Sequence, residues 1–182
     1  MTRLYTFFVF LTSETLGQCY YTAMQAPSPS PYEFKRANAQ DATTLTQWIQ
    51  RYYAYDHIPF NEALILPAIP HLLKNDQEGV AYFVTLNDLT IGYFILTFGF
   101  DLEFGGKLAI VTDLFFDEAV RRKGAGHATI QFIQSICLEA GIAVLQLQVE
   151  TDNREAQAFY QKSGFKTLTR HSLIRELQKA AP

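Results

Sequence analysis

Six consecutive residues read Arg121-Arg122-Lys123-Gly124-Ala125-Gly126, between an apolar, strand-like stretch (108–117) and a stretch with apolar residues at helical spacing (127–140). The first N–H groups of a helix have no partner within the helix and lie at the positive end of its dipole, so they favour anions. Gly124 and Gly126 put no Cβ between the backbone and a ligand, and they tolerate positive φ angles. The segment therefore predicts a binding site for a phosphate or pyrophosphate group, with a charged surface turn as the alternative.

A second segment with regular spacing follows downstream. After a helix stop at Gly141 and an apolar strand (143–149), the chain reads Asn153-Arg-Glu-Ala156-Gln-Ala-Phe159-Tyr160-Gln-Lys-Ser-Gly164-Phe165. Together, Arg121-x-x-Gly124-x-Gly126, the strand end Leu147 to Val149 and Asn153-x-x-Ala156-x-x-Phe159-Tyr160-x-x-x-Gly164-Phe165 resemble the GNAT superfamily of acetyl-CoA-dependent N-acetyltransferases. In element order the resemblance covers residues 31–177. It implies an enzyme that moves the acetyl group of acetyl-CoA to a primary amine, by direct attack in a ternary complex.

Hydrophobic periodicity predicts the remaining elements. Strands are expected at 32–37, 79–86, 91–99, 108–116, 143–149, 165–170 and 172–177, and helices at 41–53, 127–140 and 154–162. A shorter helix from Phe60 or Asn61 is expected to break at Pro67 and Pro70. Hairpins followed by strand–helix–strand–helix–strand predict an α/β fold of the α+β type, with a mixed, mostly antiparallel sheet of six to seven strands and helices on both faces. The resemblance adds a central parallel pair of strands that splay apart to admit the pantetheine arm of the cofactor.

Composition limits the classes of function. The 182 residues suit one domain, and the net charge of −3 argues against a nucleic-acid partner. Cys19 and Cys137 make neither a disulfide framework nor a metal-ligand cluster, so no metal is expected. A reducing, cytoplasmic setting without membrane association fits, because acetyl-CoA is a cytosolic metabolite, and GNAT-like domains often form homodimers.

The N-terminal 30 residues read differently from the rest. An apolar run from Leu4 to Leu11 resembles a signal-peptide core, but it is shorter than the ~20 residues that span a bilayer as a helix. We expect an extension, or a start assigned too early with Met24 as the true start. The run Pro27-Ser-Pro29-Ser-Pro31 predicts a stiff linker. The expected division is an extension and linker over 1–30 and a GNAT-like domain over 31–182.

The resemblance assigns the cofactor site. It implies that Leu114, Phe115 and Phe116 offer main-chain groups to the pantetheine arm of acetyl-CoA. It also implies that the segment of Arg121, Arg122, Lys123, Gly124, Ala125, Gly126 and His127 surrounds the pyrophosphate. Asn153 is expected to cap its helix and to bond the pantetheine arm; capping alone is the alternative. A backbone N–H near Phe116 is a candidate donor to the thioester oxygen.

Acetyl transfer to an amine needs an acid for the departing sulfur and a route for the amine proton. Tyr160, seven residues after Asn153, is the candidate acid, because a phenol with a pKa of about 10 is protonated at neutral pH. A packed core aromatic is the alternative. In related ribosomal-protein acetyltransferases a Glu occupies the middle of the Leu-x-Val strand end, whereas this chain has Gln148, which cannot accept a proton. Asp113 is the candidate base in its place. Weaker candidates are Asp101, Glu103 and Glu150.

The acceptor side is expected to use the first helices. An aromatic and acidic cluster suits a cationic amine, although ordinary helix packing explains it equally well; its members are Tyr52, Tyr53, Tyr55, Asp56, His57 and Glu62, joined by Phe98, Asp101 and Glu103. Two alternative functions stay open: transfer of a different acyl group, and a CoA-binding sensor or interaction module with little turnover, which Gln148 favours.

Overall fold

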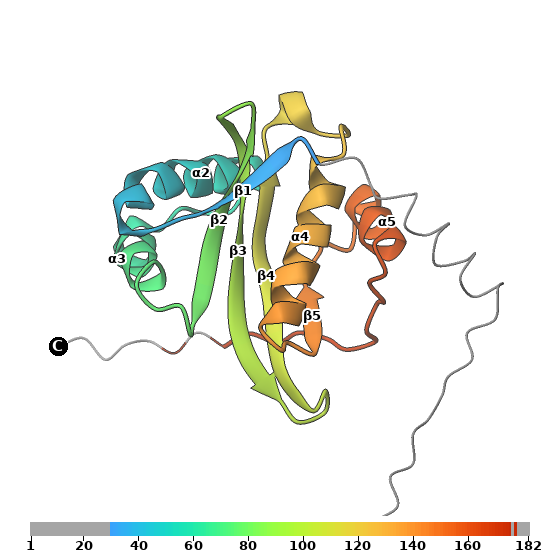
Figure 1. Ribbon diagram of the computed structural model, residues 1–182. Coiled ribbons are helices and arrows are strands. Elements are labelled where there is room, and N and C mark those ends of the chain that lie inside the picture. Colours follow the sequence, from blue (N-terminus) through green and yellow to red (C-terminus); the bar gives the residue numbers. More distant parts are fainter. Residues whose placement is uncertain (1–29, 176, 178–182) are drawn as a thin grey trace, which may run out of the picture. The chain divides into compact units, whose positions relative to one another are not determined.

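The computed structural model describes residues 30–175 and 177 (Figure 1). The chain divides into two units, Met1–Pro31 and Tyr32–Pro182, and all elements described below belong to the second. The expected signal-like run and the alternative start at Met24 lie outside the described residues.

One five-stranded sheet forms the centre of this unit, with its strands in chain order. The strands are β1 (Tyr32–Arg36), β2 (Gly79–Leu86), β3 (Leu89–Asp101), β4 (Gly106–Phe116) and β5 (Val144–Leu147). Neighbours from β1 to β4 are antiparallel, and β4 and β5 are parallel. The prediction of a mixed, mostly antiparallel sheet with one parallel pair is therefore confirmed.

The described residues form five strands, fewer than the six to seven predicted. The two strands expected at 165–170 and 172–177 are absent from the described residues, and Leu173 and Ile174 there are 92% and 90% exposed. Alternation along a segment makes a strand only where a neighbouring ladder accepts its backbone bonds. Arg170 instead contacts Glu103 of the β3–β4 turn at 2.6 Å, so a side chain holds this segment.

Helices cover both faces of the sheet. They are α2 (Ala42–Tyr55), α3 (Glu62–Leu72), α4 (Ala125–Glu139) and α5 (Arg154–Lys162), with single 3-10 turns η1 (Ala39–Asp41) and η2 (Glu118–Val120). Figure 1 shows α2 and α3 on one side and α4 and α5 on the other. No helix among the described residues has the length and apolar character needed to cross a lipid bilayer.

The expected break in the second helix was wrong, because α3 continues through Pro67 and Pro70. A proline in a helix removes the bond to the carbonyl four residues earlier. Those carbonyls belong to Ala63 and Leu66, which are both exposed, so water can satisfy them.

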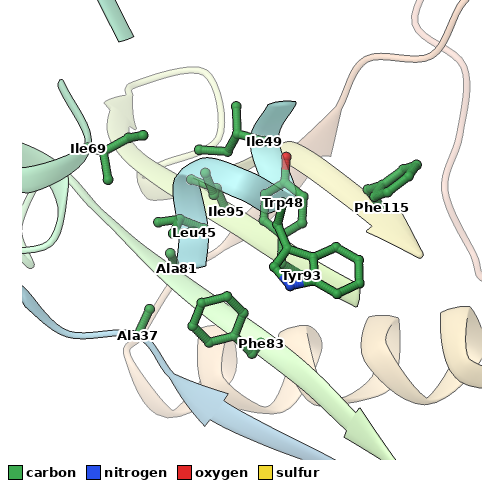
Figure 2. Close-up of a cluster of buried hydrophobic side chains, with 10 residues drawn as sticks. All are labelled: Ala37, Leu45, Trp48, Ile49, Ile69, Ala81, Phe83, Tyr93, Ile95 and Phe115. Carbon is green, nitrogen blue, oxygen red and sulfur yellow. The ribbon is translucent and has the colours of Figure 1, made fainter. Parts of the chain in front are cut away.

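Two buried clusters hold the layers together. The first packs α2 and α3 onto the sheet, and Figure 2 shows Tyr93 lying there among Leu45, Trp48 and Ile95. The second packs α4 and α5 onto the opposite face through Ile130, Ile133 and their neighbours. Since alternate strand residues point to opposite faces, the register of each strand decides which cluster a side chain joins.

Candidate active site

The open edge of β4 is the first component of the site. Strand β4 pairs with β5 only from Leu108 to Val111, although β4 continues to Phe116. Beyond Val111 the β5 side of β4 has no ladder partner among the described residues, which agrees with a splayed pair.

Two contacts show which backbone groups face that edge. The Asp117 N–H donates to the Ile91 carbonyl at 2.9 Å, and the Phe115 carbonyl lies against Gly92, so both point toward β3. Since backbone groups alternate along a strand, the N–H and C=O groups of Leu114 and Phe116 point the opposite way, to the open edge. The Phe116 carbonyl accepts a bond from Arg121 Nε at 3.1 Å, as expected for a group outside the ladder.

The N-terminus of α4 is the second component. Its N-cap is Gly124, with φ of 94° and no side-chain cap. The Ala128 N–H donates to the Gly124 carbonyl at 3.1 Å, which leaves the N–H groups of Ala125, Gly126 and His127 ahead of the first helical bond. A Cβ placed on Gly124 would have nothing within 4 Å, so the space in front of this turn is open. Uncapped N–H groups beside open space suit an anion.

The two glycines of this turn have different roles. Gly124 supplies the left-handed backbone, as expected. Gly126 lies inside the helix, and a Cβ there would sit 3.2 Å from Cζ of Phe159 on α5. The absent side chain of Gly126 therefore makes room for Phe159 of α5, and the expected contact of Gly126 with a ligand stays a prediction.

The three basic side chains before Gly124 point in different directions. The guanidinium of Arg121 lies 4.0 Å from the ring centre of Tyr55. The guanidinium of Arg122 forms two bonds, of 3.0 and 2.9 Å, with Glu155 of α5. The Lys123 side chain is exposed, and the backbone carbonyl of Lys123 accepts a hydrogen bond from the Tyr32 hydroxyl at 2.6 Å. Arg121 and Arg122 therefore connect the turn to α2 and α5, respectively.

Asp113 lies on the face of β4 that packs toward α2, opposite the face that α4 covers. Its Oδ2 accepts a hydrogen bond from the Tyr93 hydroxyl at 2.7 Å. Burial raises the pKa of the Asp113 carboxyl, and the Tyr93 hydrogen bond opposes part of this rise. A carboxylate with a raised pKa is a better proton acceptor than an exposed one.

Two tyrosines of α2 also lie near this carboxylate. Burial raises the pKa of Tyr52, and the charges of Asp56 and Asp113 and the nearby Tyr160 add to the rise. Burial and then Asp113 raise the pKa of Tyr53. Tyr52 and Tyr53 of α2 thus lie near the Asp113 carboxyl, Tyr160 of α5 lies near Tyr52, and the three phenols are protonated at neutral pH.

Asn153 is the N-cap of α5, and Tyr160 lies on that helix. The Asn153 Oδ1 accepts a bond from the Ala156 N–H at 3.1 Å, so the expected capping is confirmed. Tyr160 packs with its ring centre 5.1 Å from that of Phe159 and 5.6 Å from that of Phe165. Burial raises the pKa of the Tyr160 phenol, which keeps it protonated at neutral pH.

A shallow pocket of about 480 Å³ lies between the C-terminal half of α2 and the end of β4. It is lined by Arg51, Ala54, Tyr55, Phe115, Asp117 and Glu118. Arg51 pairs with Asp117 at 2.8 Å across it. Sequence reasoning included Tyr55 and Phe115 but missed this ion pair and Tyr93, because partners 66 and 20 residues apart leave no local spacing signal.

Several weaker candidates lie elsewhere. Asp101 ends β3 at the turn into β4, and Glu103 within that turn pairs with Arg170, which lowers the pKa of Glu103. Glu150 precedes α5 and is exposed, as is Gln148 after the end of β5. No group of three or more potential metal ligands occurs among the described residues.

Comparisons with known proteins point to one family. A sequence model of the acetyltransferase (GNAT) family matches residues 42–165. A Bacillus subtilis (strain 168) protein, the uncharacterized N-acetyltransferase YhfO, is 25% identical over 134 residues, which are 72% of this chain and 87% of that protein.

Solved structures share the fold. A possible acetyltransferase from Clostridium difficile 630 superposes with a TM-score of 0.72 at 19% identity, covering 81% of this chain and 99% of that one. An aminoglycoside acetyltransferase, meta-AAC0020, from an uncultured soil metagenomic sample was solved in complex with sisomicin. It superposes with a TM-score of 0.68 at 17% identity, covering 81% of this chain and 97% of that one.

Proposed function

The chain belongs to the GNAT family of acetyltransferases, which use acetyl-CoA as co-substrate, and we propose that it acetylates a primary amine by direct attack in a ternary complex. The observation that carries this proposal is the open edge of β4 beside the uncapped N-terminus of α4, with Asp113 on β4 and Tyr160 on α5. These groups fit a thioester donor that carries both an amide-containing arm and a pyrophosphate.

The donor would be held by backbone groups. We assign the outward-facing N–H and C=O groups of Leu114 and Phe116 to the amides of the pantetheine arm, with Phe115 between them. The N–H groups of Ala125, Gly126 and His127 would bind the pyrophosphate, aided by the exposed side chain of Lys123. Arg121 and Arg122 would hold this turn in shape through their contacts with Phe116 and Glu155. The Asn153 amide nitrogen is left to bond the arm.

Asp113 would accept the proton that the amine loses as it attacks. An alkyl amine with a pKa of about 10.4 is neutral in only about one molecule in 2,500 at pH 7, so a proton acceptor beside the acceptor amine matters. Tyr160 would give its proton to the departing sulfur and regain one from solvent. A backbone N–H of the open edge near Phe116 would stabilise charge on the thioester oxygen, a contribution of about 3 kcal/mol where it has been measured.

The test is thiol release from acetyl-CoA against a panel of primary amines: polyamines, amino acids, peptide N-termini and an aminoglycoside such as sisomicin. CoA binding is followed by calorimetry alongside. Release with one amine class, reduced about 10²–10⁴-fold in Asp113→Asn and in Tyr160→Phe, is the expected result. Tight CoA binding without release from any amine would contradict acetyl transfer to these acceptors and favour a CoA-binding sensor, which the exposed Gln148 makes the second candidate.

A further inference from the structure

We propose that Tyr93 is a positioning residue of the acetyl-transfer site, whose hydroxyl holds one oxygen of Asp113 so that the other faces the acceptor amine. This inference rests on the proposed function, in which Asp113 accepts the amine proton. Tyr93 itself touches neither substrate.

The Tyr93 side chain is more deeply buried than Tyr52 and Tyr53, the other tyrosines near the carboxylate. It is fully buried, with a relative exposure of 0%, and its ring centre lies 6.4 Å from that of Trp48 (Figure 2). Its hydroxyl donates to Asp113 Oδ2 at 2.7 Å. A buried hydroxyl needs a partner, because an unsatisfied one is costly, so packing of the ring fixes the place of that carboxylate oxygen.

A β-bulge brings the two residues onto one face. Ile95 lies opposite Asp113 and Leu96 opposite Val111, which leaves Thr112 as an extra residue in β4. Before the bulge, Ala109 and Val111 pack toward α4. Regular alternation from Val111 would send Asp113 to that same face, and the extra residue turns it instead toward Tyr93 and α2.

The second oxygen of Asp113 is the one left for chemistry. Tyr93 is the hydrogen-bond partner that the described part of the chain gives this carboxylate, and the bond uses Oδ2. The titratable groups that face it are Tyr93 from β3 and Tyr52 and Tyr53 from α2, and all three have raised pKa values, so none is charged at neutral pH. Asp113 is partly accessible, so its free oxygen can meet an amine or a water.

The hydrogen bond also lowers the pKa of the Asp113 carboxyl. Burial raises the pKa of Asp113 and the Tyr93 bond lowers it, so losing the hydroxyl should raise that pKa further. Hydrogen bonds to charged groups are worth enough to move a titration by roughly one to two pH units. A purely structural role of Tyr93 would leave the pH–rate profile unmoved even where the Asp113 titration moves.

The test compares Tyr93→Phe with Tyr82→Phe in the full chain. Tyr82 is a matched control, because it lies on the adjacent strand β2 and packs on the other face against Phe94 at 5.1 Å. The Asp113 carboxyl is titrated by NMR in protein labelled with 13Cγ-aspartate, with its signal assigned from Asp113→Asn. The pH dependence of kcat/KM is measured with the amine that releases most thiol in the panel above.

In Tyr93→Phe, we expect the Asp113 titration and the acidic limb of kcat/KM to move together to higher pH, by roughly one to two units. Tyr82→Phe should move neither. An unmoved Asp113 titration in folded Tyr93→Phe would overturn the inference. Full activity of Asp113→Asn would instead refute the base assignment of the proposed function, and the NMR titration would distinguish the two failures.

A second variant tests the inference if Tyr93→Phe does not fold. Replacing Tyr93 by 3,5-difluorotyrosine keeps the ring and makes the hydroxyl a stronger donor. The Asp113 titration should then move to lower pH, and no movement would overturn the inference.

Discussion

Two alanine substitutions at the start of α4 separate backbone strain from side-chain crowding. A Cβ at Gly124 would meet nothing within 4 Å, whereas a Cβ at Gly126 would lie 3.2 Å from Cζ of Phe159. Crowding alone therefore predicts that Gly126→Ala is the harmful change. The backbone angles predict the reverse, because φ at Gly124 is 94°.

The magnitudes favour the backbone. An alanine forced into the left-handed region costs about 1–2 kcal/mol, and no new contact offsets that cost at Gly124. At Gly126 the Phe159 ring must move by a few tenths of an ångström, and it is a partly exposed side chain on a short helix. Replacing a helical glycine by alanine contributes up to about 0.8–1.0 kcal/mol in the opposite direction. We expect Gly124→Ala to lower the free energy of unfolding by about 1–2 kcal/mol and Gly126→Ala to leave it nearly unchanged.

Urea unfolding and calorimetric CoA binding test both parts of this reasoning. Because the bare Cα of Gly126 faces Phe159, Gly126→Ala should bind CoA almost as the wild type does. Gly126→Val should lose about 1–3 kcal/mol of stability by overpacking against the ring. If Gly126→Ala abolished CoA binding while its unfolding free energy stayed unchanged, Gly126 would face the ligand and the packing argument would be refuted.

Three further predictions concern α5 and the Asp113 carboxyl. Tyr160→Phe should lower kcat by about 10²–10⁴-fold with CoA affinity unchanged, and full turnover would remove Tyr160 from the mechanism. Burial raises the pKa of Asp113 in the folded protein above its ordinary value. The stability that this carboxyl contributes is therefore fully present below its ordinary pKa and is lost as the pH rises through its pKa in the folded state. Asp113→Asn should therefore gain stability relative to the wild type between acidic and neutral pH, and a difference independent of pH in urea unfolding would contradict this. Asn153→Ala should cost about 1 kcal/mol in thermal unfolding through the lost cap on Ala156, whereas Asn153→Asp, which keeps a capping oxygen, should cost little.

The elements that local chemistry determines could be predicted from the sequence. Helix α5 runs over 154–162 as expected, since Asn153 caps it and Gly164 follows it with φ of 93°. The parallel pair around α4 was expected from the resemblance to the GNAT superfamily, and β4 and β5 form it. Elements that depend on a distant partner could not be predicted. The two expected C-terminal strands do not form in the described chain, because no neighbouring strand accepts their backbone hydrogen bonds. Helix α3 tolerates its two prolines because it is exposed to water there, and the sequence alone does not show that exposure.

The candidate base shows the same limit at the level of one residue. Asp113 was identified as a carboxylate on the strand before the glycine turn, but strand alternation alone places it with Val111, on the face toward α4. The register shift between Ile95 and Leu96 reverses this and brings Asp113 to Tyr93, a residue that reads as core from its apolar strand. A bulge has no reliable sequence signature here, since Thr112 fits a regular strand as well as an irregular one. The chemistry of this carboxylate therefore depends on a backbone irregularity that only the paired sheet reveals.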